Sequence, residues 1–235
     1  MRFETTQWSV VLAVAGDDSA AARRALATLC ETYWYPLYAY IRRRGYTPED
    51  AQDLTQSFFT LLLERHDFNA VDRERGRFRA FLLASLQHFL ANDAVRRRAQ
   101  KRGGGQPALS LSLEDAEGRY QFEPAGGLTP ETIFDRRWAL TVIERVLNEL
   151  RADAREAGNA DEFERLKASL LGQAPAGGYA AIAKGLGTTE GAVKVAVHRL
   201  RRTFHETLRR HIAETVLSEQ DVDEEIRYLI RAVSQ

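Results

Sequence analysis

The residues whose chemistry is easiest to assign lie on one face of a predicted helix, and they suit recognition rather than catalysis. That outer face combines hydrogen-bond donors with one aliphatic side chain: Lys194, Val195, His198, Arg199 and Arg202. The opposite face is an apolar stripe with i, i+4, i+7 and i+11 spacing, made of Val193, Val197, Leu200 and Phe204. A helix with small, apolar and basic groups on its outer face fits the major groove of DNA, where it can contact base edges.

This helix is the second of a predicted helix-turn-helix over residues 179–202. The first helix has an apolar face ending at Leu186, and Gly187 stands where the turn needs a positive φ. Thr188 is the expected N-cap of the second helix, with Glu190 in its positively polarised first turn. The alternative is an ordinary helical hairpin with a solvated basic face. The combination of the glycine turn, the helix lengths and the charge placement favours the helix-turn-helix.

Motifs of catalysis and metal binding are absent from the sequence. It has no HExxH motif, no glycine-rich phosphate loop and no nucleophile motif. The pair His66-Asp67 is superficially similar to metal phosphohydrolases, but the other histidines lie in predicted helices beside basic or aromatic residues: His88, His198, His205 and His211. We therefore expect no enzymatic activity, no metal and no cofactor.

Cysteine usage and hydropathy predict a cytoplasmic protein. The single cysteine, Cys30, cannot form an internal disulfide and is expected to be a small buried residue in a reduced compartment. No apolar run approaches the roughly 20 residues of a membrane span, and the N-terminus lacks the regions of a signal peptide. We expect no contact with a membrane.

The net charge is zero, but the charges are separated along the chain. Residues 72–102 hold nine basic against three acidic residues, a net of +6, and residues 179–210 hold seven against two, a net of +5. Residues 103–135 carry a net of −5 and residues 211–235 a net of −4. Two basic blocks on a neutral chain predict two nucleic-acid surfaces.

The chain is predicted to be all-α, because it lacks alternating Val, Ile and Thr runs and is rich in Ala, Leu, Arg and Glu. Breaks such as Gly103-Gly104-Gly105 divide it. We expect two helical domains, residues 20–102 and 130–210, joined by a flexible acidic linker, 103–129, and followed by an acidic amphipathic tail, 211–235.

The first domain contains two notable helices. One starts at Thr47-Pro48-Glu49-Asp50, which combines an N-cap, a proline and two acids. Its polar arc, taken alone, is typical of an ordinary solvated face. The other interleaves arginines and aromatics from Arg77 to Phe89 and ends in a basic cluster. That mixture suits single-stranded nucleic acid, although the phenylalanines could equally form a core face.

Three segments, in this order, resemble the bacterial extracytoplasmic-function (ECF) sigma factors. LYAYIRRRGYTPEDAQDLTQSFFTLLLER is similar to the start of their first conserved domain, the region 2-like domain. FRAFLLASLQHFLANDAVRRRAQKR resembles its promoter-melting helix. YAAIAKGLGTTEGAVKVAVHRLRR resembles the second conserved domain, the region 4-like domain, in which Glu-Gly-x-Val-Lys opens the recognition helix. This chain departs from that pattern at Val195 and Ala196, where a polar residue followed by Arg is usual.

The resemblance implies a role for each surface. Docking on the clamp of core RNA polymerase would fall to Asp50, Asp53, Leu54 and Gln56. Capture and melting of the −10 element would fall to Arg73, Arg75, Arg77, His88, Asn92, Arg96, Arg97 and Arg98. The −35 duplex would be contacted by Lys194, Val195, His198, Arg199 and Arg202. The implied partners are core RNA polymerase through its clamp and flap regions, promoter DNA, and an anti-sigma factor or other regulator.

A different class remains open: a helix-turn-helix regulator that binds operator DNA alone, usually as a symmetric dimer. The second basic-aromatic domain and the acidic helix argue against it.

The tail predicts one further helix. Ser218 is its expected cap, acidic residues fill the first turns, and a stripe follows at Ile226, Leu229, Ile230 and Val233. We expect this stripe to cover the second domain. In the alternative, the acids also lie near one of two basic surfaces, residues 96–102 or 199–210, and hold the free protein closed until polymerase or a partner displaces the tail.

Overall fold

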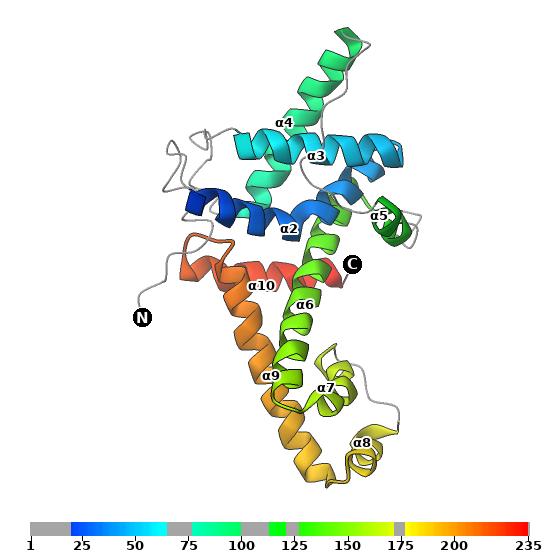
Figure 1. Cartoon of the computed structure of the whole chain (residues 1–235), viewed down its shortest axis with the longest axis vertical. Helices are drawn as coiled ribbons and strands as arrows, with labels where there is room; N and C mark the ends of the chain where they lie inside the picture. Colours follow the sequence, from blue (N-terminus) through cyan, green and yellow to red (C-terminus); the bar gives the residue numbers. More distant parts are fainter. Residues whose placement is uncertain (1–19, 65–76, 100–112, 121–126, 172–176, 235) are drawn as a thin grey trace. The chain divides into compact units, whose positions relative to one another are not determined.

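The computed structural model describes residues 20–64, 77–99, 113–120, 127–171 and 177–234 (Figure 1). The predicted all-α class is confirmed, because every element within these ranges is helical. The only pairing between extended segments there is an isolated antiparallel bridge of Arg77 with Val216. None of the described helices has the length and apolar character that a membrane crossing requires.

The described elements follow one another along the chain in a fixed order. They are α2 (Ala20–Arg43), α3 (Pro48–Glu64), α4 (Phe78–Ala99), α5 (Leu113–Tyr120), α6 (Pro130–Glu156), α7 (Ala160–Leu166), the 3-10 turn η3 (Lys167–Leu171), α8 (Gly178–Leu186), α9 (Glu190–Ala213) and α10 (Glu219–Val233). Two compact units result: residues 1–141 with 212–235, and residues 142–211. The division falls within α6, so this helix contributes its first turns to one unit and the rest to the other.

In the first unit, α2 and α3 pack side by side (Figure 1). The predicted start of α3 is confirmed, since the amide of Asp50 donates to Thr47 Oγ1 at 3.2 Å. The largest fully buried side chains come from α2, α3, α4 and the first turns of α6: Tyr33, Leu37, Tyr38, Tyr40, Ile41, Leu54, Phe59, Phe78, Leu82, Phe134 and Trp138.

The phenylalanines of α4 belong to this core. Phe78 is fully buried, and its ring lies edge-on to Tyr33 with centroids 5.1 Å apart. The ring of Phe89 lies 5.7 Å from that of Phe58 on α3. Of the two readings of the aromatic spacing, the structure supports the core face, so Phe78 is not available to stack on a base in this conformation.

The predicted linker, 103–129, contains an ordered helix. Residues 113–120 form α5, and the Glu117 carboxylate accepts from Arg42 Nε at 3.0 Å, Arg42 Nη2 at 2.8 Å and Tyr38 OH at 2.6 Å. The pKa of Glu117 is lowered, chiefly by the hydrogen bonds from Arg42. Within the predicted linker, residues 113–120 are therefore helical, and a bidentate ion pair holds α5 on α2.

The tail helix belongs to the first unit, where Tyr228 contacts Asp135 and Trp138 in the first turns of α6. Its cap is as predicted, with Ser218 Oγ accepting from the amide of Asp221 at 3.3 Å. Its buried face differs in part from the prediction: Ile226 and Leu229 are buried, whereas Ile230 is 57% exposed. The face is completed by Val222, Glu225 and Ala232, so it includes a carboxylate.

The second unit contains the remainder of α6, then α7, η3, α8 and most of α9. Its core beneath the helix-turn-helix is formed by five buried residues: Leu166, Ile182, Ala183, Val193 and Val197. Tyr179, Leu186, Ala196 and Leu200 pack against this cluster. The short helix α7 thus packs against the helix-turn-helix through Leu166.

Candidate nucleic-acid interface

The turn between α8 and α9 is built as its residue types require. Gly187 has φ +63°, a left-handed conformation that favours glycine. The amide of Thr188 donates to the carbonyl of Ala183 at 2.9 Å, which closes the end of α8. The turn therefore ends one helix and redirects the chain within three residues, Gly187 to Thr189.

The N-cap of α9 is Thr189 rather than the predicted Thr188. Thr189 Oγ1 accepts from the amide of Ala192 at 3.2 Å, and the carbonyl of Thr189 accepts from Val193 at 3.1 Å. Both threonines suit a cap. The residue next to Gly187 is occupied in closing α8, so the cap falls one position later.

The five residues proposed for base contact all lie exposed on α9, away from the buried Val193 and Val197. They are Lys194, Val195, His198, Arg199 and Arg202. Val195 is 50% exposed. In the described part of the chain, Ile230 is the one other large apolar residue that is this exposed. The face therefore offers donors and methyl groups together, as major-groove contact needs.

Two of these cations have acidic neighbours on the same helix. Lys194 Nζ lies 2.7 Å from Glu190 Oε1, and this hydrogen bond raises the pKa of Lys194. Arg202 Nε lies 3.5 Å from Glu206 Oε1. Both pairs are well exposed and have i,i+4 spacing, so each is weak enough to exchange for a phosphate or a base.

The α4 residues proposed for the −10 element are only partly described. His88 and Asn92 are exposed and four residues apart on α4. Arg77 precedes the helix and is partly buried. Arg73 and Arg75 lie outside the described residues; Arg96, Arg97 and Arg98 lie in α4, but their side chains are outside the description.

On α3 the four residues proposed for polymerase docking separate into two groups. Asp53 is exposed, and Asp50 and Gln56 are half-buried, so all three reach the surface. Leu54 is 2% exposed and belongs to the core. Leu54 is therefore corrected from a docking contact to a residue that holds α3 in place.

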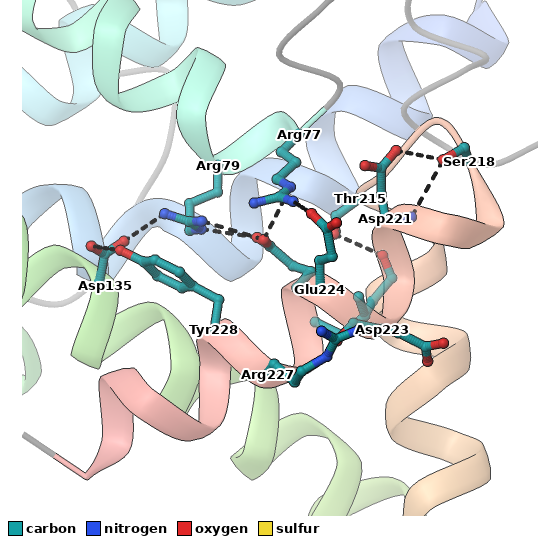
Figure 2. Close-up of polar contacts among 12 residues, drawn as sticks. Arg77, Arg79, Asp135, Thr215, Ser218, Asp221, Asp223, Glu224, Arg227 and Tyr228 are labelled. Atoms are coloured by element: carbon teal, nitrogen blue, oxygen red, sulfur yellow. Dashed lines mark hydrogen bonds and ion pairs between the residues drawn. The ribbon is translucent and has the colours of Figure 1, made fainter.

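Sequence reasoning missed an ionic cluster at the start of α4. Arg79 Nε donates to Glu225 Oε1 of α10 at 2.9 Å, and Arg79 Nη1 donates to Asp135 Oδ1 of α6 at 2.7 Å (Figure 2). Tyr228 OH donates to Asp135 Oδ2, and the Arg79 guanidinium lies 4.0 Å from the centroid of the Tyr228 ring. Three helices of the first unit therefore meet at one guanidinium.

Burial and charge act in opposite directions on this cluster. Desolvation alone would lower the pKa of Arg79, but its hydrogen bonds with Glu225 and the nearby carboxylate charges outweigh burial and raise it. Desolvation raises the pKa of Asp135, against the influence of Arg79. Arg79 thus stays charged although the residue is only 8% exposed.

A sequence signal for this cluster existed. Val222, Ile226 and Leu229 define the buried stripe of α10, and Glu225 falls within it at the i+3 position from Val222. A carboxylate on an apolar stripe needs a buried cation. The basic residues of 72–102 were the available partners.

Comparison of the chain with family models, with curated proteins and with solved structures gave no match. The functional argument therefore depends on the geometry and on the residue patterns.

Proposed function

We propose that this protein is a sigma factor of the ECF type. It would bind core RNA polymerase in the cytoplasm and direct it to promoters by contacting a −35 duplex and melting a −10 element. The observation that carries the proposal is the exposed face of α9, where donors and methyl groups lie opposite a well-packed helix-turn-helix core.

One glycine supports a contact at this face. A Cβ on Gly191 would meet nothing nearer than Thr189 Oγ1 at 4.0 Å, and its φ is not in the left-handed region. Glycine in a helix costs about 1 kcal/mol relative to alanine. The fold of the free protein does not require this residue, but a smooth surface at the start of α9 would let DNA approach closely.

The first unit supplies the surfaces that distinguish a sigma factor from a stand-alone regulator. Asp53 is exposed on α3, while His88 and Asn92 are exposed on α4. A helix-turn-helix regulator that binds operator DNA as a dimer would have no need of polar faces for polymerase and for single-stranded DNA. The separate polar faces of α3 and α4 therefore favour the sigma factor.

The docking assignment is tested by reversing one charge. Asp53→Arg, combined with Gln56→Ala, should abolish binding to core polymerase, because charge reversal in a complementary contact costs several kcal/mol. The control is Glu156→Arg, which reverses an exposed charge at the end of α6 and should bind as the wild type does. Pull-down with core polymerase measures binding, and circular dichroism checks the fold. A folded double variant that binds fully would refute the assignment.

A further inference from the structure

The side chain of Arg77, one of the proposed −10 contacts, is already held by α10. Arg77 Nη2 donates to Glu224 Oε2, and Arg77 Nε lies 3.5 Å from Glu225 Oε2 (Figure 2). The Arg77 side chain is only 25% exposed, whereas that of Glu224 is 60% exposed. A cation expected to face nucleic acid is therefore covered by a carboxylate of the same chain.

Glu224 and Glu225 differ in how easily each can break its ion pair with arginine. Glu225 is 1% exposed and shares Arg79 with Asp135, so removing it from Arg79 would leave a buried guanidinium short of a partner. The amide of Phe78 also donates to the carbonyl of Thr215 at 3.0 Å, which ties the segment before α10 to the start of α4. These contacts keep α10 in place.

Glu224 has no such restraint. Its pair with Arg77 is open to water on the glutamate side, and exposed ion pairs contribute little to stability. Rotation of an exposed side chain takes picoseconds to nanoseconds. Glu224 can therefore leave Arg77 while the helix that carries it stays docked.

We propose that Glu224 is an internal competitor for nucleic-acid phosphate at Arg77, and that α10 holds it there without itself moving. A guanidinium binds a carboxylate and a phosphate with the same donors, so only one can occupy Arg77 fully. The inference rests on the proposed function, since it assumes that the start of α4 meets DNA. In this proposal the Glu224 side chain alone gives way to phosphate, and the tail helix does not have to be displaced.

The experiment uses the full chain and a labelled single-stranded DNA oligonucleotide of fixed sequence. Glu224→Gln should bind it about two- to five-fold more tightly than the wild type at low salt, as expected for release of one exposed ion pair. The dependence of log K on log salt should steepen by about 0.7, the value for one additional phosphate contact on a single strand. Fluorescence anisotropy over a salt series measures both quantities.

The control on the same helix is Glu219→Gln, which removes the same charge from an exposed position in the first turn of α10. It should leave the salt slope unchanged. Arg77→Gln should remove the gain in DNA affinity that Glu224→Gln gives. The single variant Arg77→Gln and the double variant with Glu224→Gln should therefore bind DNA equally. Thermal unfolding confirms that each variant is folded.

Three results would overturn the inference: Glu224→Gln matching the wild type, matching Glu219→Gln, or keeping its gain without Arg77. If these occur while the wild type still supports promoter-dependent transcription with core polymerase, the proposed function stands and only the competition fails. If no folded variant binds single-stranded DNA and core polymerase gains no promoter activity, the proposed function and the competition fail together.

Discussion

Loss of the Glu225 carboxylate should destabilise the first unit far more than loss of its neighbour. Glu225 accepts from Arg79 Nε at 2.9 Å and Nη2 at 3.3 Å, and both side chains are nearly inaccessible to water. Breaking a buried ion pair by removing one partner costs about 3–5 kcal/mol. Glu225→Ala should approach that range. Glu225→Gln should cost about 2–3 kcal/mol, because an amide oxygen retains one hydrogen bond and Asp135 still pairs with Arg79.

Tryptophan fluorescence during urea unfolding reports on this unit alone. Trp34 and Trp138 belong to it, and the sequence of residues 142–211 contains no tryptophan. Glu224→Gln is the matched control and should cost less than about 1 kcal/mol, since its pair is exposed. A total stability of about 5–15 kcal/mol makes these losses easy to separate.

A compensating variant tests the cause. Replacing Arg79 with Met and Glu225 with Leu, together with Asp135→Asn, removes all three charges of the cluster and keeps apolar contacts with Trp138 and Tyr228. This triple variant should recover much of the loss, because hydrophobic residues often replace a buried ion pair at little cost and no unpaired carboxylate is left behind. If Glu225→Ala costs no more than Glu224→Gln, the cluster does not hold α10 and the reasoning is refuted.

Two further predictions concern the α9 face and α5. Arg199→Ala should weaken promoter binding by about 1–3 kcal/mol and relax preference at one −35 position in a panel of promoter variants; a uniform loss across the panel would mean phosphate contact only. Glu117→Gln should destabilise the first unit by about 1 kcal/mol at pH 7, because two hydrogen bonds from Arg42 lose their charged acceptor. The folded pKa of Glu117 lies below its usual 4.5, so its contribution is present above that pH and is lost as the pH falls through the folded pKa. The difference between variant and wild type in fluorescence-monitored unfolding should therefore shrink in acid, and a constant difference down to acid pH would contradict the assignment.

The helix-turn-helix could be predicted from sequence because each local signal agreed with the others. The apolar spacing of α9, the left-handed Gly187 and the basic outer face all indicated the same arrangement. The cap was misplaced by one residue because Thr188 and Thr189 are chemically equivalent. Their hydrogen bonds distinguish them: the amide of Thr188 donates to Ala183, whereas Thr189 Oγ1 accepts from the amide of Ala192.

The position of α10 could not be predicted in the same way. Its cap and most of its apolar stripe were evident, but periodicity shows which face is buried and not what covers it. The packing partner is set by Arg79, which binds both Asp135 and Glu225. Asp135 lies 56 residues and Glu225 146 residues after Arg79 in the sequence. Likewise, an acidic composition suggested a linker where Glu117 instead pairs with Arg42.

Run-off transcription with purified core RNA polymerase tests the central claim most directly. Genomic fragments are transcribed with core enzyme alone, with the full chain alone and with both, and the start sites are mapped. We expect defined start sites only when both are present, sharing one sequence upstream near −35 and another near −10. Protection of a palindrome by this protein alone, with no start site gained on adding core polymerase, would contradict the account.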